Sequence, residues 1–169
     1  MNVDFITAIK LFFANYVNFK GRSTRAEYWW AWLFCLLVSV ILSALGVVGS
    51  VLSGVASLVF LLPSLAIATR RLHDTGRSGW WLVGYYAITW TIGIWLLVSM
   101  FMAIGSDGLI AMSTNNAAGI NPALMLGWLK GALVPGLICV VLGIVYLIFM
   151  CQPSGPDNKY GPDPYGEEE

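Results

Sequence analysis

The sequence predicts an all-α membrane protein with four transmembrane helices, both termini in the cytoplasm and an amphipathic interfacial helix at the N-terminus. The 169 residues are 58% hydrophobic and only 11% charged, with eight tryptophans, which is a membrane composition. Charge-free runs recur at the length of about 20 residues that crosses a hydrocarbon core about 30 Å thick. We therefore expect an interfacial helix over 1–20, a four-helix membrane domain over 21–152 and a tail over 153–169.

The N-terminal segment 4–17 has its large apolar residues at helical spacing. They are Phe5, Ile9, Phe12, Phe13 and Tyr16. An amphipathic helix with this stripe can lie along the cytoplasmic leaflet, with the apolar side in the acyl boundary. The same stripe can instead pack on the protein's own helices, and the sequence leaves both interpretations open.

The first charge-free run lies between Glu27 and Arg70. It is too long for one span and about right for two spans with a short turn. The Gly/Ser-rich stretch 46–54 supplies that turn, so we predict helices over 29–48 and 51–69.

Local signals refine these two helices. Thr24 and Glu27 have the spacing of a capping box, which predicts that the first membrane helix starts at Arg25. Pro63 removes a backbone donor from the second helix, and the freed carbonyl needs a partner from a neighbouring helix or from Ser64.

Two further charge-free runs, 78–106 and 131–156, predict helices over 79–104 and 132–151. The segment between them, 105–128, is expected to be a moderately apolar outer loop. Asn121 followed by Pro122 is a good helix start, so a short interfacial helix is expected to lead into the last span.

The basic residues set the orientation. With the N-terminus inside, eight of the nine fall on the cytoplasmic side and only Lys130 lies near the outer face. The positive-inside rule then predicts that both termini are cytoplasmic. The eight are Lys10, Lys20, Arg22, Arg25, Arg70, Arg71, Arg77 and Lys159.

This topology brings three polar stretches, 20–27, 70–78 and 155–164, to the same membrane face. Their polar side chains form a candidate ligand-binding or structural cluster. It comprises Arg22, Arg25, Glu27, Arg70, Arg71, His73, Asp74, Arg77, Ser78, Asn158 and Asp163. Ion pairs within the cluster can lock the loops together, or the guanidinium groups can bind a phosphate or carboxylate. Chemistry by His73, oriented by Asp74, is a third interpretation.

Aromatic residues next to these stretches are expected to anchor the helix ends at headgroup depth. They are Tyr28, Trp29, Trp30, Trp80 and Trp81. We assign no catalytic residue, cofactor or metal site, because the chain has one histidine and three cysteines without paired spacing. Nucleic-acid binding is not expected, since the basic residues lie at helix ends without a soluble recognition element.

Three motifs carry a family resemblance: "GRSTRAEYW", "RRLHDTGRSGWW" and "NKYGPDP". They resemble, in order and over about residues 19 to 164, the domain of unknown function 805 family, the YhaH-like small bacterial inner-membrane proteins. The resemblance implies a multi-pass protein of the bacterial inner membrane and brings no established activity.

The sequence favours a structural or accessory subunit that docks on a membrane assembly or self-associates. Its expected partners are the lipid bilayer and other membrane proteins or a second copy of the chain. The alternative is a module that binds or transports an anionic lipid headgroup or small anionic solute through the arginine cluster. We do not expect an enzyme; lipid-phosphate chemistry at His73 is the least favoured interpretation.

Overall fold

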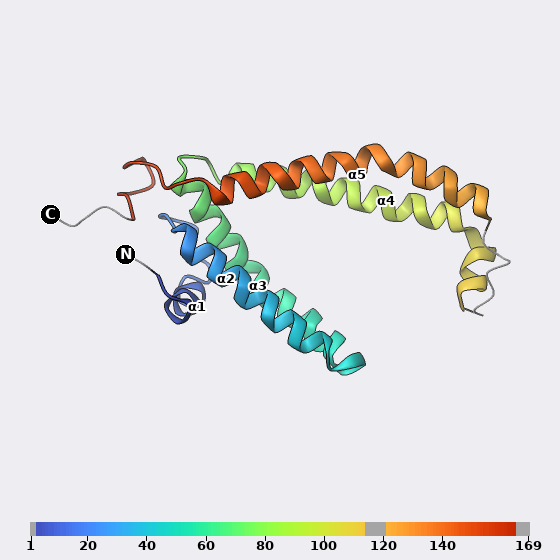
Figure 1. Cartoon of the computed structure of the whole chain (residues 1–169), viewed down its shortest axis with the longest axis horizontal. Helices are drawn as coiled ribbons and strands as arrows, with labels where there is room; N and C mark the ends of the chain where they lie inside the picture. The colour runs from blue at the N-terminus through green and yellow to red at the C-terminus, as the bar shows by residue number, and fades with distance from the viewer. Residues whose placement is uncertain (1–2, 114–120, 165–169) are drawn as a thin grey trace. The chain divides into compact units, whose positions relative to one another are not determined.

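The computed structural model describes residues 3–113 and 121–164, with side chains given outside 106–113. The described chain is helical, and its one strand-like pairing is an isolated bridge between Asn158 and Gly161. Figure 1 shows the five helices, which are α1 (Phe5–Ala14), α2 (Arg25–Ser43), α3 (Gly46–Asp74), α4 (Trp80–Ser113) and α5 (Pro122–Cys151). Four of them, α2 to α5, contain stretches long and apolar enough to cross a membrane. The predicted all-α architecture with four candidate spans is confirmed.

Contacts divide the chain into two units. The first contains the described parts of 1–82 and 147–169, and the second is 83–146. α1, α2 and α3 belong to the first unit together with the tail, whereas most of α4 and α5 forms the second.

The turn between the first two spans is shorter than predicted. α2 ends at Ser43 and α3 begins at Gly46, so the predicted turn over 46–54 is wrong and these residues are helical. Gly46 has φ of +64°, a conformation that glycine adopts without steric cost, and this lets the chain reverse direction tightly. The Ser50 hydroxyl in this stretch donates to the carbonyl of Val47, one turn back, and is therefore satisfied within the helix.

The start of α2 agrees with the prediction. The helix begins at Arg25, and the hydroxyl of Thr24 accepts a hydrogen bond from the Glu27 amide at 3.2 Å. The capping residue thus satisfies one of the amides that a helix N-terminus leaves unpaired.

α3 continues through Pro63 because the missing hydrogen bond is replaced from outside the helix. The carbonyl of Val59, four residues before Pro63, loses its normal donor. The hydroxyl of Tyr16 donates to this carbonyl. The donor comes from the segment that follows α1, and not from a neighbouring helix or from Ser64, the two sources that the sequence suggested.

α1 packs against α2 and α3. Ala8 and Phe12 are buried on its inner side. The Phe12 ring lies 6.4 Å from the Phe34 ring of α2 and 6.2 Å from the Phe60 ring of α3, measured between centroids, in edge-on arrangements. α1 therefore makes the intramolecular contacts that one of the two sequence interpretations expected.

In the second unit, α4 and α5 run side by side (Figure 1). The indole Nε1 of Trp128 donates to the hydroxyl of Ser99 at 3.0 Å, and the rings of Tyr85 and Tyr146 stack at 4.8 Å. These polar and aromatic contacts tie the helices together near both ends of the unit.

The segment predicted as an outer loop, 105–128, is helical where it is described. Helix continues to Ser113 past a break at Gly105, where φ is +65°. A helix does start at Pro122, with the side-chain oxygen of Asn121 accepting from the Ala123 amide at 3.0 Å, but it is α5 itself, whose predicted start was residue 132. The helix then runs without interruption to Cys151, so no separate interfacial helix precedes the last span.

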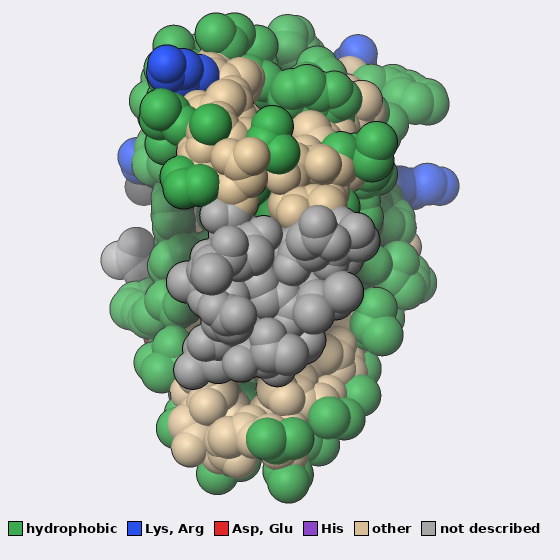
Figure 2. All heavy atoms as spheres, turned by 90° about the vertical axis from the view of Figure 1, so that its right-hand side faces the viewer, with side chains coloured by type: hydrophobic (Ala, Val, Ile, Leu, Met, Phe, Trp, Pro, Cys, Tyr) green, Lys and Arg blue, Asp and Glu red, His purple; other side chains and the backbone are tan. Residues whose placement is uncertain are grey.

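The outer surfaces of these helices are hydrophobic. Apart from the residues in grey, the face drawn in Figure 2 carries mainly hydrophobic side chains, with lysine and arginine at its margins. Val47, Leu58 and Trp80 are 84%, 72% and 77% exposed. Such a surface is unfavourable in water and suits acyl chains, so the protein is a multi-pass membrane protein.

Candidate functional site

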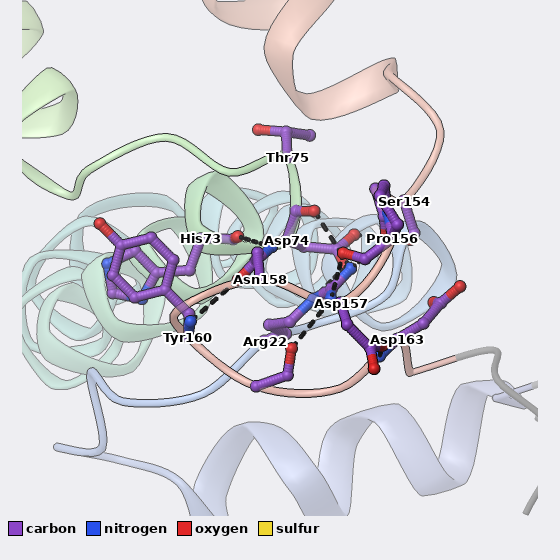
Figure 3. Close-up of polar contacts among 12 residues, drawn as sticks. Arg22, His73, Asp74, Thr75, Ser154, Pro156, Asp157, Asn158, Tyr160 and Asp163 are labelled. Atoms are coloured by element: carbon purple, nitrogen blue, oxygen red, sulfur yellow. Dashed lines mark hydrogen bonds and ion pairs between the residues drawn. The ribbon is translucent and has the colours of Figure 1, made fainter.

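The three polar stretches meet in the first unit. Arg22 precedes α2, Asp74 ends α3, and the tail after α5 folds back over both (Figure 3). We call this arrangement the tail latch, meaning Arg22, Arg71, Asp74 and the tail backbone between 150 and 161 that they bind. It fixes the C-terminal segment to the ends of α2 and α3.

Arg22 occupies the centre of the tail latch, and each of its five N–H donors has an acceptor. Its Nε donates to Asp74 Oδ1 at 2.9 Å. Nη1 donates to the carbonyls of Pro156 and Gly161 at 3.0 and 3.1 Å, and Nη2 donates to the carbonyls of Asp74 and Gly155. The side chain is 2% exposed, so no face of the guanidinium is open to another anion.

Asp74 holds two arginines with one carboxylate. Oδ1 faces Arg22, whereas Oδ2 accepts from Arg71 and from the hydroxyl of Ser154. Arg71 also donates to the carbonyls of Met150 and Gln152, where α5 ends. Asp74 and Arg71 are both fully buried. Charges removed from water in this way are tolerable only because they are paired and hydrogen-bonded.

A tight turn in the tail completes the latch. Asn158 and Gly161 exchange backbone hydrogen bonds at 3.2 and 3.0 Å, and Gly161 has φ of +140°. The Asn158 amide nitrogen donates to the carbonyl of His73 at 3.1 Å, while its oxygen accepts from the Tyr160 amide. Asp157 accepts from the Asp163 amide at 2.8 Å, which closes the loop beyond the turn.

His73 is engaged as a structural group. Its ring stacks on Tyr160 with 3.8 Å between centroids and 3° between planes. Nδ1 lies 3.3 Å from the carbonyl oxygen of Gly21, so the tautomer protonated on Nδ1 donates to it. The Asp74 carboxylate instead faces the two arginines, so Asp74 does not orient His73 as the acid–base interpretation expected.

A second ion pair connects α2 with α3. Arg70 Nη2 lies 3.3 Å from Glu27 Oε1, and the two residues are 4% and 7% exposed. The Ser23 amide donates to the Arg70 carbonyl at 3.3 Å. Glu27 therefore serves both the start of α2 and the end of α3.

The remaining predicted cluster residues lie outside the latch. Arg77 donates to the side chain of Gln152 and stacks over the Phe149 ring at 4.1 Å, a cation–π contact. The Ser78 hydroxyl accepts from the Trp80 amide at 3.4 Å, near the start of α4. Arg25 is exposed and contributes none of the hydrogen bonds that the structure describes in the latch.

The predicted aromatic anchors differ in exposure. Tyr28 is 8% exposed and points into the protein, against the edge of Trp29. Trp30, Trp80 and Trp81 are 38%, 77% and 59% exposed, as residues at a lipid interface would be.

Sequence reasoning missed several members of the latch. The sequence places Ser154 and Gly155 only in the tail over 153–169 and Gln152 only at the end of the membrane domain, and it singles out neither Gly21 nor Tyr160, which contact His73 beside the latch. Most of them act through backbone carbonyls, which no side-chain pattern reveals. The one available signal was the Pro/Gly density of "QPSGPDNKYGPDP", which is typical of a chain that turns repeatedly.

The arrangement as a whole immobilises the chain. Among the described residues, no group of three His, Cys, Asp or Glu side chains could hold a metal ion. The buried guanidinium groups of the latch are engaged by carbonyls and by Asp74. Arg22 joins the start of α2, the end of α3 and the tail through its five hydrogen bonds. This geometry is typical of a group that holds a structure together.

The chain matches a family model and is similar to several known proteins. The model of a family described as "Protein of unknown function (DUF805)" matches residues 16–162. Inner membrane protein YhaI of Escherichia coli (strain K12) is 40% identical over 98 residues, covering 56% of this chain and 81% of the relative. Inner membrane protein YhaH of the same strain is 36% identical over 98 residues, covering 52% and 76%. Uncharacterized protein YiiR, also of that strain, is 28% identical over 152 residues, covering 86% and 85%.

No solved structure matches the chain significantly. Neither the family description nor the names of these relatives indicates catalysis. The family match covers most of the chain, including α2 to α5 and all residues of the tail latch. The chain therefore belongs to the DUF805 family of unknown function, whose members YhaI and YhaH are inner membrane proteins.

Proposed function

We propose that the protein is a structural or accessory subunit of the bacterial inner membrane, which docks on a membrane assembly or on a second copy of itself. The observation that carries this proposal is the complete engagement of Arg22 by five acceptors in a 2% exposed site. A centre whose donors are all used internally stabilises one conformation of the chain and leaves little capacity for a substrate. A fixed conformation is what a docking subunit requires.

Both termini lie in the cytoplasm in this proposal. The distribution of basic residues supports the orientation, because the tail latch brings the segments that contain Arg22, Arg71 and Lys159 to the same ends of α2 and α3. Reporter fusions test it: a fluorescent protein should be active at either terminus, and alkaline phosphatase at neither. Phosphatase activity at one terminus would reject the orientation.

The alternative, recognition of an anionic headgroup through the arginine cluster, has less support. Arg22, Arg70 and Arg71 are buried and already paired within the protein. A ligand would first have to displace these partners, which would lose the favourable free energy of the buried ion pairs before any ligand contact formed.

The docking proposal is tested by extracting the chain with its lipids in styrene–maleic acid discs and measuring the mass of the particles. We expect a defined assembly larger than one 18.5 kDa chain. Arg22→Lys, which weakens the latch, should reduce the assembled fraction, while the exposed neighbour Arg25→Lys should leave it unchanged. A monomeric particle without a second protein, from wild-type membranes, would reject the proposal.

A further inference from the structure

The depth at which α1 docks is unusual for a helix at a membrane surface. Its N-terminal end is near the start of α2, where the Phe5 ring lies 5.6 Å from the Trp30 ring. Its C-terminal end reaches Phe34 and Phe60, which lie well inside α2 and α3. We infer that α1 is embedded obliquely in the lipid leaflet next to the tail latch, with its outer side against acyl chains.

The length of α2 fixes where the membrane begins. α2 has 19 residues, which extend about 28 Å at 1.5 Å per residue, while a hydrocarbon core is about 30 Å thick. Any tilt shortens this reach. α2 can cross the core only if nearly all of it lies inside, so the boundary is close to Arg25 and the buried Arg70–Glu27 pair lies just within it.

The depth of each α1 contact below that boundary follows from its position along α2 or α3. Trp30 is five residues into α2 and Phe34 is nine residues into it, which correspond to depths of about 7 and 13 Å. On α3, Val59 lies eleven residues before Arg70, or about 16 Å along the helix. The N-terminal segment therefore descends from about 7 Å below the boundary, where Phe5 meets Trp30, toward the centre of the bilayer, where the Tyr16 hydroxyl meets Val59.

The hydrogen bond from Tyr16 to Val59 holds the deep end in place. The Val59 carbonyl is unpaired within α3 because of Pro63, and such a carbonyl is costly to expose to acyl chains. In water the carbonyl would find a partner in solvent. In lipid the Tyr16 hydroxyl becomes the partner, so the bond ties the N-terminal segment to this depth.

The outer side of the N-terminal segment fits acyl chains as its occupant. Ile6, Phe13 and Val17 are 56%, 40% and 65% exposed. Val17 follows Tyr16, whose hydroxyl binds the Val59 carbonyl, so the deep end of this surface is near the level of Leu58. Leu58 is 72% exposed on the membrane-crossing α3, so the two residues belong to one lipid-facing surface. Lys10 is exposed and lies between Ile6 and Phe13 in α1. Its aliphatic side chain is long enough to place the ammonium group back at the headgroups.

Spin-label accessibility in vesicles tests the inference. In a chain with Cys35, Cys139 and Cys151 replaced by alanine, a nitroxide is attached at Val17→Cys. The Leu58→Cys variant provides the matched lipid-facing control and Lys159→Cys the aqueous control, since Lys159 is exposed in the tail. We expect the ratio of oxygen to water-soluble nickel-chelate collisions at position 17 to equal that at position 58 and to exceed that at position 159.

Two results would overturn the inference. A ratio like that of position 159 would mean that the segment lies in water, and protection from both reagents would mean that protein covers it. If the cysteine-free chain does not fold, benzoylphenylalanine is placed at position 17 of the native chain. Its photocrosslinks then show whether lipid or protein surrounds this residue. Adducts with lipid acyl chains support the inference, whereas adducts only with α4, α5 or a second copy, or no adducts with lipid, contradict it.

Discussion

Replacing Arg22 with lysine keeps the positive charge and removes the shape that the tail latch uses. The guanidinium makes five hydrogen bonds, three of them to tail carbonyls, whereas an ammonium has three donors. At least two bonds are lost, each worth about 1.5 to 3 kcal/mol when the donor is charged. The latch should weaken by about 3 to 6 kcal/mol, and even the lower value raises the released fraction of the tail about 100-fold.

Hydrogen exchange of the tail measures this release directly. The Gly155 amide donates to the Asp74 carbonyl at 3.1 Å, and the Gly161 amide to Asn158, so both are protected only while the tail is bound. In Arg22→Lys these amides should exchange about 100-fold faster or more, since local opening determines their rate. Arg25→Lys, three residues away and exposed, is the matched control and should exchange like the wild type. Unchanged exchange in Arg22→Lys, or equal acceleration in both variants, would refute the role given to Arg22.

Two further predictions concern buried polar groups. Asp74→Asn leaves two buried guanidinium groups without a counter-charge and should destabilise the fold by about 3 to 5 kcal/mol. The thermal midpoint in detergent should therefore fall, whereas the exposed Asp157→Asn should leave it nearly unchanged. Equal midpoints for the two variants would contradict the ion-pair account. Tyr16→Phe should cost about 0.5 to 1.5 kcal/mol by removing the donor to Val59. In a Pro63→Ala background, where the restored amide can bond the same carbonyl, that cost should fall markedly, and an undiminished cost in the double mutant would show that Tyr16 acts elsewhere.

The number of candidate membrane helices was predictable from the sequence, and so were two positions at which a helix begins, although the helix at Pro122 was expected to be a separate interfacial one. Charge-free runs locate spans because a bilayer excludes charged groups, and the starts at Arg25 and Pro122 follow from capping chemistry at Thr24 and Asn121. The turn at Gly46 was misplaced because serine and glycine, which break helices in water, are tolerated in membrane helices. The helical residues between 105 and 128 were missed for a related reason, since moderate polarity alone does not end a helix.

The tail latch was only partly accessible to sequence reasoning. An even number of crossings is enough to predict that residues near 22, 74 and 158 share one end of the helices, and the structure brings these segments together. The acceptors of Arg22 could not be predicted, because three are carbonyls of the tail whose direction depends on the folded turn at Asn158 and Gly161. A pattern of side chains contains no information on where a main-chain oxygen points.

The span of chain that the latch joins determines when the protein can finish folding. Arg22 and Gly161 are 139 residues apart, so the arginine leaves the ribosome long before its last acceptor exists. At about 5 to 20 residues per second, the wait is roughly 7 to 28 s. During this interval the ends of α2 and α3 carry charges without their final partners, and only the arrival of the segment 150–161 shields them. The stability of α2 and α3 thus depends on residues translated much later, and a product truncated before Gly161 leaves the membrane-inserted helices with an unshielded polar end that quality-control proteases can recognise.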